Sequence, residues 1–410
     1  MNAFGLSWRY LWSRPLATSL NLILLTLGLA SMAFVILVRD HAGRAFERDL
    51  AGIDAVVGAK GSPMQLILAG VFHIDVPPGN IPLVEARRLG EHPQVAQWIP
   101  LSLGDNLQGF RIVGTTHAYP QHYGAQLSQG ALWSVPLEAV LGAQVAASTG
   151  LQPGQAFQGA HGLGNGGAVH EATPYRVTGV LAPCGCVLDR LVLTATESVW
   201  QVHDDIHTDP SMDPAESAEL AEALAAEREI TMALLRYRTP LAAASFPRHV
   251  NQSTSMQAAA PALEISRLLQ IVGVGTELLR ALTAVLLAVA GLSVFIALWN
   301  AVRERRADLA MLRMLGAPPR RLAGLLLLEA FWLALLACAM GLLAAYGLVA
   351  LAGHWLEAAQ SLALAPWRWV PDLIWVPVLA AGVAWLAACL PVVQAYRIDV
   401  FQLLNARSVP

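Results

Sequence analysis

Four long stretches without a charged residue constrain this chain more than any other feature. The first, Pro15–Val38, is followed by a long segment of ordinary mixed polarity. The other three, Ala281–Val302, Ala330–Leu356 and Leu373–Tyr396, come in close succession near the end of the sequence. Each exceeds the ~20 apolar residues that an α-helix needs to cross the ~30 Å hydrocarbon core of a bilayer. We therefore predict a membrane α-helical fold with four transmembrane helices in a 1 + 3 arrangement.

Composition agrees with a membrane protein that carries a water-exposed domain. Hydrophobic residues make up 55% of the 410 residues and charged residues only 13%, against ~25% charged residues in soluble domains. The formal net charge of −3 argues against a nucleic-acid partner. Arg9 and Arg14 precede the first stretch as in a signal peptide, but signal peptides hold only ~7–15 apolar residues. We therefore expect an uncleaved anchor.

Arginines in the short loops predict the orientation, because cytoplasmic loops are enriched in basic residues. The loop between the third and fourth stretches has a single arginine, Arg368. The loop between the second and third stretches has six: Arg303, Arg305, Arg306, Arg313, Arg320 and Arg321. We expect that loop and both termini in the cytoplasm, and residues 39–270 on the outer side of the membrane.

The outer segment predicts a large α+β domain of two lobes, with the smaller lobe near residues 125–205. Val95–Gly114 predicts two strands around a turn at Gly104–Asp105–Asn106, and Leu137–Ser148 predicts a helix that ends near Gly150. Further strands are expected at Tyr175–Leu181, Leu191–Thr194 and Ile230–Tyr237, and a further helix at Asp209–Glu229.

The cytoplasmic loop predicts a short amphipathic helix. Leu309, Leu312 and Leu315 recur at helical spacing among charged residues, Gly316 is a typical helix C-cap, and Pro318 with Pro319 ends the pattern. From the residues alone, two interpretations stay open. The helix could rest on the lipid surface with its arginines on anionic headgroups, or it could dock into a cytoplasmic partner.

Three segments carry a resemblance to a known family. Arg303–Glu304–Arg305 and the run Met311–Ala317, with Glu329 in the next span, resemble the signature of FtsX-like ABC permeases, which include MacB and the LolC/LolE type. The tail Ala395–Leu404 resembles the family's C-terminal stretch, and Asp54–Pro63 resembles the start of its periplasmic domain in one branch. The resemblance covers the whole layout and is weak through the outer domain.

The resemblance implies a mechanotransmitting permease in the bacterial inner membrane. It implies a second copy of the permease and a dimer of a separate cytoplasmic ABC ATPase as partners, with ATP and Mg²⁺ bound by the ATPase. It also implies that one coupling segment receives the ATPase, with these residues: Arg303, Glu304, Arg305, Arg306, Leu309, Leu312, Leu315 and Gly316. Glu329 is an intramembrane acid, and acids inside spans often have a functional role. It could instead lie near the cytoplasmic end of the span and snorkel, or pair with Arg320 or Arg321.

The expected organisation follows from these inferences. It consists of a cytoplasmic amphipathic N-terminus (1–14), a first span (15–38), a periplasmic domain that ends in a helical stalk (39–270), a second span (271–302), the coupling loop (303–321), a third span (322–353), a periplasmic loop (354–372), a fourth span (373–396) and a cytoplasmic tail (397–410). The proline-free pattern from Pro261 predicts that one continuous helix joins the stalk to the second span.

No catalytic constellation is apparent, so an enzyme is not expected. A Walker A motif needs Gly-Lys-Ser/Thr, and the sole lysine, Lys60, lies between Ala59 and Gly61. Gly162–Gly167 has the spacing of a dinucleotide-binding loop, but a strand follows it where such a site needs a helix. We interpret it as a hairpin loop.

Two clusters in the outer domain are weak candidates for metal ligands. His203 and His207 would share one face if helical, and Cys184 and Cys186 offer two thiols, which suit zinc or copper. Neither cluster has the four-ligand spacing of a structural zinc site. The cysteines could instead be buried or pair between chains, because a disulfide between residues two apart is expected to be strained.

The leading hypothesis is an ATP-driven permease subunit that exports, extracts or releases a periplasmic or membrane cargo. The alternatives are a membrane-anchored metal-binding or sensor protein, and a regulator of a periplasmic enzyme that transports nothing. A periplasmic adaptor or substrate-binding protein and membrane lipids are further expected partners. The sequence does not identify the cargo, its contacts or its direction of movement, nor does it separate a homodimer from a heterodimer.

Overall fold

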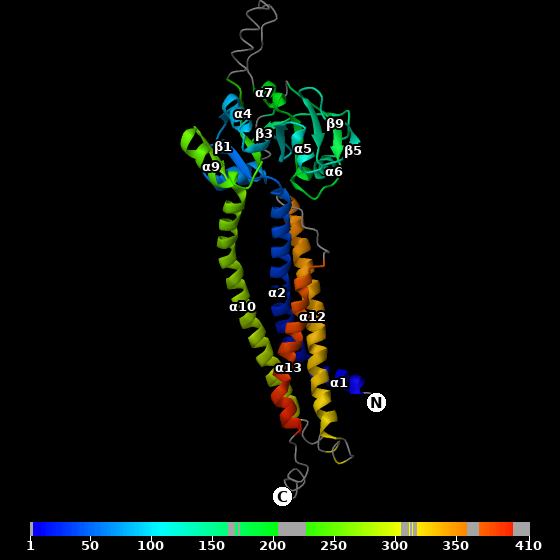
Figure 1. Ribbon diagram of the computed structural model, residues 1–410. Coiled ribbons are helices and arrows are strands. Elements are labelled where there is room, and N and C mark those ends of the chain that lie inside the picture. The colour runs from blue at the N-terminus through cyan, green and yellow to red at the C-terminus, as the bar shows by residue number, and fades with distance from the viewer. Residues whose placement is uncertain are drawn as a thin grey trace, which may run out of the picture. The chain divides into compact units, whose positions relative to one another are not determined.

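The computed structural model describes residues 3–162, 169–170, 173–203, 227–304, 311, 314, 318–358 and 369–396. The helix expected at Asp209–Glu229 lies outside these residues, except at its last positions. The chain divides into two compact units, each with its own hydrophobic core (Figure 1). The helical unit comprises Met1–Ala42, Ile271–Glu357 and Leu362–Pro410, and the sheet unit comprises Gly43–Gln270 and Ala358–Ser361.

Within the described residues, four helical segments are long and apolar enough to cross a membrane. Proline is the first residue of α2, α10 and α12, where its fixed φ favours the first turn and its missing N–H leaves no helical bond unmade. The segments are α2 (Pro15–Asp49), α10 (Pro261–Glu304), α12 (Pro319–Ala358), and the 3₁₀-helix η2 (Pro371–Ile374) with α13 (Trp375–Tyr396). The short helix α1 (Ala3–Leu11) precedes them.

The helix that the sequence predicts to be continuous is present as α10, which has 44 residues. At 1.5 Å per residue its length is ~66 Å, about twice the ~30 Å hydrocarbon core. Its residues through Gln270 belong to the sheet unit, and its residues from Ile271 onward belong to the helical unit.

Small and aliphatic side chains at every third or fourth position form the core of the helical unit. Alanines recur on α13, and leucine or valine recurs on α2 and α10, so the buried stripes interlock closely. The stripes include Leu25, Leu29, Ala33 and Leu37 of α2, Leu287, Ala290, Val294 and Leu298 of α10, and Ala380, Ala384 and Ala388 of α13. The other faces expose large apolar side chains such as Leu16, Ile23, Leu282 and Leu292, as expected for helices surrounded by lipid.

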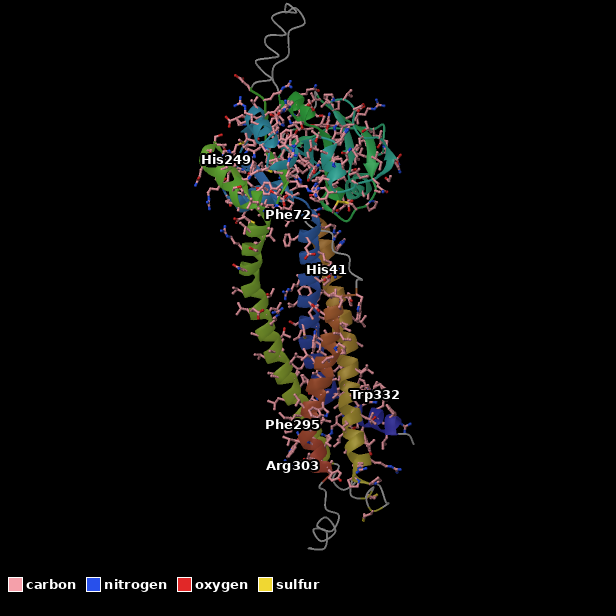
Figure 2. The ribbon with its side chains drawn as sticks, viewed as in Figure 1. His41, Phe72, His249, Phe295, Arg303 and Trp332 are labelled. Atoms are coloured by element: carbon pink, nitrogen blue, oxygen red, sulfur yellow. A yellow bond between two sulfur atoms is a disulfide. The ribbon has the colours of Figure 1, made fainter. Side chains whose placement is uncertain are left out.

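The N-terminal helix α1 packs against α12 through aromatic rings. Trp332 of α12, labelled in Figure 2, lies with its ring centroid 5.3 Å from that of Trp8 and 6.4 Å from that of Phe4. Trp8 and Phe4 remain 38% and 58% exposed. Tryptophan rings such as those of Trp8 and Trp332 are enriched where a membrane meets water, which suits a short helix beside a span.

A mixed sheet of eleven strands organises the described part of the sheet unit. Its strand order is β13-β1-β12-β3-β4-β10-β6-β9-β5, with β7 paired to β9 and β8 paired to β3, while β11 and β2 form a separate pair. The β10–β4 and β6–β9 pairs are parallel. The strands are β1 (Ala55–Ala59), β2 (Ile81–Pro82), β3 (Val95–Leu107), β4 (Phe110–Thr115), β5 (Leu127–Gly130), β6 (Glu138–Leu141), β7 (Ala156–Phe157), β8 (Ala160–His161), β9 (Tyr175–Leu181), β10 (Val192–Ala195), β11 (Glu229–Ile230), β12 (Met232–Tyr237) and β13 (Met256–Ala259).

Helices cover both faces of this sheet because its strands alternate two apolar sets. Val56 of β1 joins a core cluster with Leu66 and Ile67 of α3, whereas its neighbour Val57 joins a second cluster with Phe246 of α9. Successive side chains of a strand point to opposite faces, so α3 and α9 lie on opposite sides of β1. The helices are α3 (Pro63–Gly70), α4 (Leu83–Gly90), α5 (Ala118–His122), α6 (Ala143–Thr149), η1 (Val187–Arg190), α7 (Thr196–His203) and α9 (Ala242–Ser253).

The turn predicted at Gly104–Asp105–Asn106 is wrong. These residues lie within the strand, and the hairpin turn falls at Gln108 and Gly109, whose φ values are 50° and 87°. The Asn106 side chain accepts a hydrogen bond from the Gly109 backbone N–H at 2.7 Å, which favours the turn at this later position.

The predicted helix Leu137–Ser148 is also partly wrong. Glu138–Leu141 form strand β6 between β10 and β9, because pairing on both sides buries the run Ala139–Leu141. Helix α6 then begins at Ala143 and ends at a left-handed Gly150, where the sequence places its end. The strands expected at Tyr175–Leu181 and Leu191–Thr194 are confirmed as β9 and β10.

Candidate functional site

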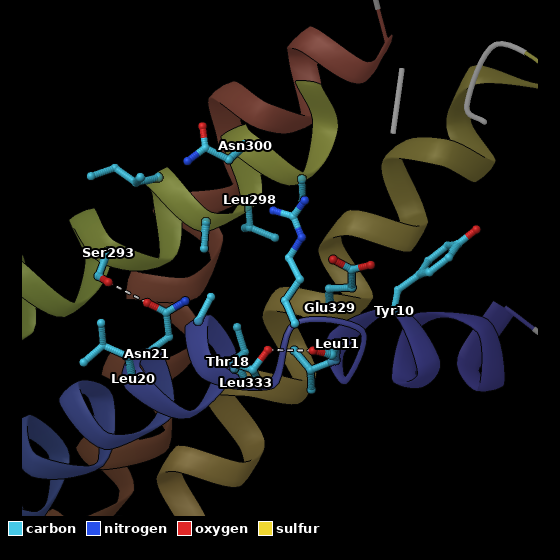
Figure 3. Close-up of a pocket in the computed structure, with 15 residues that line it drawn as sticks. Tyr10, Leu11, Thr18, Leu20, Asn21, Ser293, Leu298, Asn300, Glu329 and Leu333 are labelled. Carbon is cyan, nitrogen blue, oxygen red and sulfur yellow. Dashed lines mark hydrogen bonds between the residues drawn. The ribbon is translucent and has the colours of Figure 1, made fainter. Parts of the chain in front are cut away.

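A pocket of about 220 Å³, lined by both apolar and polar side chains, lies among α1, α2, α10 and α12 of the helical unit (Figure 3). Its lining is unusual for a helix bundle of this hydrophobicity, because polar and charged side chains enter it from every one of these segments. They are Tyr10, Arg14, Thr18, Asn21, Ser293, Asn300 and Glu329. Polar groups at such a position mark pathways, switches or structural cross-links in membrane proteins.

Hydrogen bonds fix α2 on both sides of this pocket. The Thr18 hydroxyl donates to the Leu11 carbonyl oxygen at 2.6 Å, which ties the start of α2 to the end of α1. The Ser293 hydroxyl of α10 donates to the Asn21 side-chain oxygen of α2, also at 2.6 Å (Figure 3). Such bonds between spans contribute ~0.6 kcal/mol on average, so they orient the helices more than they hold them together.

A second polar link and a close glycine contact continue the α2–α10 interface. The Ser31 and Thr283 hydroxyls lie 2.9 Å apart. At Gly28, an added Cβ would lie 2.9 Å from Leu287 Cδ2, so only glycine allows this approach without a shift. Sequence reasoning missed these contacts, although small and hydroxyl residues inside a span are the signal that could have found them.

An ion pair joins the residue before the start of α2 to the last residue of α10. Arg14 precedes α2, and its guanidinium pairs with the carboxylate of Glu304, the last residue of α10. Both side chains are partly exposed, at 34% and 58%, so the pair contributes little to stability in water. Its position matters more, because Glu304 belongs to the predicted coupling segment.

Glu329 is a buried acid of α12, directly before the uncharged stretch Ala330–Leu356. Its exposed fraction is 5%, and it lines the same pocket as Arg14. Arg320 and Arg321, the partners considered from the sequence, begin the same helix about 12 Å earlier along its axis at 1.5 Å per residue. Glu329 therefore lies beside α1 and α2, and not at the start of its own helix where Arg320 and Arg321 are.

Most of the predicted coupling residues lie outside the described part of the chain: Arg305, Arg306, Leu309, Leu312, Leu315 and Gly316. Arg303, labelled in Figure 2, and Glu304 complete the last turn of α10. Of the loop that follows, Met311 and Met314 are described as helical, with exposed fractions of 57% and 55%. Exposed methionines suit an adaptable contact surface.

The structure corrects the two cysteine candidates for a metal site. Cys184 and Cys186 form a disulfide with a Cα–Cα distance of 5.1 Å, within the usual range of 4.4–6.8 Å. Gly185 adopts a φ of 62° between them, and the Asp189 carboxylate accepts the backbone N–H groups of Cys184 and Gly185 at 3.0 and 2.7 Å. This turn brings the two sulfur atoms together, so no thiolate pair is present to bind a metal.

His203 ends α7, and the structure places three further potential ligands beside it. These are Asp105, His161 and His170, which sequence reasoning did not identify. Asp105 was assigned to a turn, and the histidines are far apart in the sequence. His207, the other histidine candidate, lies outside the described residues.

A buried acid, Asp49, lies at the end of α2 within the sheet unit. The Val187 backbone N–H donates to its carboxylate at 3.0 Å, and the Tyr123 hydroxyl donates to its backbone carbonyl at 2.9 Å. Burial raises the pKa of the Asp49 carboxyl from its ordinary value of 3.8 to about 6, while the Val187 bond and then Arg190 partly oppose the increase. Asp49 therefore titrates near neutral pH.

Comparison with known families decides the identity of the chain. The model of the MacB-like periplasmic core domain matches residues 18–227, which is half of the chain, and the model of the FtsX-like permease C-terminal domain matches residues 280–400. The chain belongs to the FtsX/MacB-like permease family. This family supplies the membrane permease component of ABC transporters, and its permeases work with ABC ATPase partners.

Solved structures of the family's outer regions resemble the FtsX/MacB-like permease described here. The periplasmic region of MacB from Actinobacillus actinomycetemcomitans is 12% identical with a TM-score of 0.34, covering 53% of this chain and 95% of that chain. The extracellular domain of the noncanonic ABC-type transporter YknZ from Gram-positive bacteria is 11% identical with a TM-score of 0.29, covering 50% of this chain and 98% of that chain. A comparison with curated protein sequences finds no match.

The FtsX-like match confirms the resemblance stated from the sequence. It spans the last part of α10, the coupling loop, α12 and α13, and so includes Glu304 and Glu329. The pocket in Figure 3 is thus formed by the FtsX-like segment together with the N-terminal helices α1 and α2. The chain is a membrane permease with a periplasmic domain.

Proposed function

We propose that this permease transmits motion from a separate cytoplasmic ATPase dimer to its periplasmic domain, where the motion moves or releases a cargo. In this proposal two copies of the chain pair in a bacterial inner membrane, with both termini and the 303–321 loop in the cytoplasm. Each copy has the 1 + 3 arrangement of spans. The periplasmic domain has two lobes, an interpretation supported by β3, whose first half pairs with β12 and whose second half pairs with β4.

One observation carries the proposal, namely the uninterrupted course of α10. The helix begins at Pro261 in the sheet unit and ends at Glu304, without an internal break. A displacement applied at the coupling segment can pass along such a helix because its backbone hydrogen bonds resist bending. The Arg14–Glu304 pair and the Asn21–Ser293 bond would make α2 move together with it.

Docking of the ATPase is tested by changing the apolar face of the coupling segment. Leu312→Asp with Leu315→Asp should abolish co-purification of an ABC ATPase co-expressed from a neighbouring gene. Leu241→Asp is the matched control, because Leu241 is 77% exposed on the sheet unit and should leave co-purification intact. Retention of the ATPase by the double variant would refute docking at this segment.

Transmission is tested separately by breaking α10. An added Cβ at Gly273 meets nothing within 4 Å, so Gly273→Ala should be silent, whereas Gly273→Pro removes a helical hydrogen bond and kinks the helix. The readout is the distance between spin labels at Leu241→Cys in the two copies, with Cys338 and Cys389 replaced by alanine. ATP should change this distance in the Gly273→Ala protein and not in the Gly273→Pro protein, and equal changes in both would contradict transmission through α10.

Orientation is tested by labelling cysteines from one side of the membrane. A membrane-impermeant maleimide added to intact spheroplasts should label Leu241→Cys and spare Met311→Cys, since both positions are exposed and the proposal places them on opposite sides. Labelling of Met311→Cys from outside would overturn the proposed topology.

A further inference from the structure

Four side chains from three separate parts of the sheet unit converge on one point. Asp105 lies on β3, His161 ends β8, His170 follows the bridge residue Val169, and His203 ends α7. One potential ligand atom from each lies within 4.8 Å of the others. The convergence is produced by the fold, because neither the sequence spacing nor a single helix face places these residues together.

The Asp105 carboxylate is the unusual member of this group. Its side chain is only 2% exposed, and neither of its oxygens accepts a hydrogen bond from any residue that the structure describes. A buried carboxylate without compensation is strongly unfavourable, and buried charges are normally paired or coordinate a metal. The group nearest to the carboxylate is a set of three imidazoles.

Those imidazoles present ring nitrogens to the carboxylate at contact distance. His161 Nδ1 and His170 Nε2 lie 3.3 and 3.4 Å from Asp105 Oδ1, and His203 Nε2 lies 3.4 Å from Oδ2. His170 Nε2 is itself buried without a hydrogen-bond partner among the described residues. A cation placed among these nitrogen and oxygen atoms would be coordinated by all four side chains.

The separations match a tetrahedral zinc site. Zinc binds imidazole nitrogen and carboxylate oxygen at about 2.0–2.2 Å, and a tetrahedron with ligands ~2.0–2.1 Å from its centre has edges of ~3.3–3.4 Å. The distances from His161 Nδ1 and His170 Nε2 to Asp105 Oδ1, 3.3 and 3.4 Å, equal that edge, and His203 Nε2 lies 3.4 Å from the other carboxylate oxygen, Oδ2. The remaining separations, up to 4.8 Å, need modest rotations of the imidazoles, two of which are 47% and 34% exposed.

The backbone around Asp105 aims its side chain at the histidines. The pairing of β3 with β4 shifts register between Leu103 and Asn106, and such a bulge re-aims a side chain and is frequent beside functional sites. On its other edge, β3 pairs with β8 so that Asp105 lies opposite His161. The Gly162 N–H donates to the Gly104 carbonyl oxygen at 2.9 Å, which closes this short ladder.

Further hydrogen bonds hold the backbone that carries His161 and His170, so their imidazoles are not needed for this. The Asn106 side-chain amide donates to the carbonyl oxygens of Ala160 and Gly162, each at 3.0 Å. The His170 backbone N–H donates to the Gly159 carbonyl oxygen at 3.0 Å. Gly104 leaves room for His203, since an added Cβ there would lie 3.2 Å from His203 Nε2.

We propose that Asp105, His161, His170 and His203 bind one Zn²⁺ ion in the periplasmic domain. Three borderline imidazole ligands and one carboxylate suit zinc, whereas Ca²⁺ and Mg²⁺ prefer sites made of oxygen ligands. The partial exposure of His161 gives ions access from the periplasm. The site is independent of ATPase docking and of the mechanical role proposed above, so either proposal can fail without the other.

Zinc content of the purified full-length chain tests the site. After removal of metal with a chelator and dialysis against Zn²⁺, the wild-type protein should hold one zinc per chain by elemental analysis. Asp105→Asn and His170→Ala should each weaken binding at least tenfold. His249→Ala removes an exposed imidazole of the same unit and should retain the wild-type content. Absence of zinc from the wild type, or unchanged affinity in both site variants, would overturn the proposal.

X-ray absorption at the zinc edge keeps the test independent of how the variants fold. The zinc-loaded wild-type protein should show only nitrogen and oxygen neighbours at about 2.0–2.2 Å, with the outer-shell scattering of imidazole rings. Sulfur neighbours at ~2.3 Å would place the ion at the cysteines and refute the assignment to Asp105 and the three histidines.

Discussion

Asp105 of β3 is the register partner of His161 of β8, and His161 Nδ1 lies 3.3 Å from the Asp105 carboxylate. The pair is made by a two-residue strand that follows β7 and returns to the edge of β3 at its bulge. His170 and His203 approach the same carboxylate from the bridge beyond β8 and from the end of α7. The short pairing of β3 with β8 therefore determines whether the four side chains can converge on one ion.

Zinc should raise the unfolding temperature of the sheet unit. A ligand that binds only the folded state stabilises it by RT ln(1 + [L]/Kd), or ~2.7 kcal/mol at a hundredfold excess over Kd. The shift should be clearly smaller in Asp105→Asn and intact in His249→Ala. Without zinc, Asp105→Asn should be at least as stable as the wild type, because the variant no longer buries an uncompensated carboxylate. Thermal unfolding followed in zinc and in chelator measures both effects, and an equal zinc shift in Asp105→Asn would contradict the site.

Gly104→Ala should weaken zinc binding while the domain remains folded. The new Cβ would lie 3.2 Å from His203 Nε2, so His203 must move away from the carboxylate. We expect a several-fold loss of zinc affinity with little change in the chelator-treated unfolding temperature. Gly43→Ala is the matched control, because an added Cβ at Gly43 meets nothing within 4 Å. A competitive titration with a zinc indicator compares the two, and equal affinities would show that His203 is not a ligand.

The sequence predicts the elements of this protein better than it predicts the sites. The four spans and the strand Tyr175–Leu181 follow from apolar length and alternation, which are local properties of the chain. The bulge in β3 does not, because Gly104–Asp105–Asn106 has the composition of a turn and only pairing with β4 and β8 keeps it in a strand.

The candidate sites were harder to predict for the same reason. His203 was identified because a second histidine lies nearby in the sequence, whereas Asp105, His161 and His170 become neighbours only through tertiary structure. The Cys184–Cys186 disulfide was not expected, because the pairing depends on the left-handed turn at Gly185. Glu329 was found because a charge inside an apolar stretch needs no tertiary information to be noticed.

The stability of the sheet unit should depend on pH through Asp49. Its folded pKa of about 6 exceeds the ordinary value of 3.8, so between these values the folded state keeps a proton that the unfolded state releases. Asp49 therefore favours folding most below pH ~4, and this contribution is lost as the pH rises through ~6. Asp49→Asn removes the titration and should gain stability over the wild type by about 2–3 kcal/mol between pH 4 and pH 7.

The difference between the two proteins isolates Asp49 from other titrating groups. His73 is buried and its pKa is lowered, chiefly by burial, so its own contribution is lost as the pH falls, in both proteins alike. Thermal unfolding of wild-type and Asp49→Asn protein across this pH range gives the difference directly. A difference that does not change with pH would show that Asp49 titrates normally.

Gly28→Leu should loosen the contact between α2 and α10. The Cβ alone would lie 2.9 Å from Leu287 Cδ2, and the rest of the side chain has no space in a closely packed bundle. We expect destabilisation on the order of 1–3 kcal/mol from overpacking, measured by resistance of the helical unit to unfolding in denaturing detergent. Gly382→Leu adds the same side chain on α13 where an added Cβ meets nothing within 4 Å. If both variants lose the same stability, the close contact between α2 and α10 at Gly28 is not the cause of the loss.

Reversal of the Arg14–Glu304 pair tests whether the two charges act through each other. Arg14→Glu and Glu304→Arg each place like charges together at the end of α10 and, under the coupling proposed above, should reduce ATP hydrolysis by the co-purified ATPase. The double variant restores an opposite pair in reversed order and should recover most of that activity, even though such partly exposed pairs contribute only ~0–1 kcal/mol to stability. If the activity losses of the two single variants add up in the double variant, Glu304 and Arg14 act independently of each other.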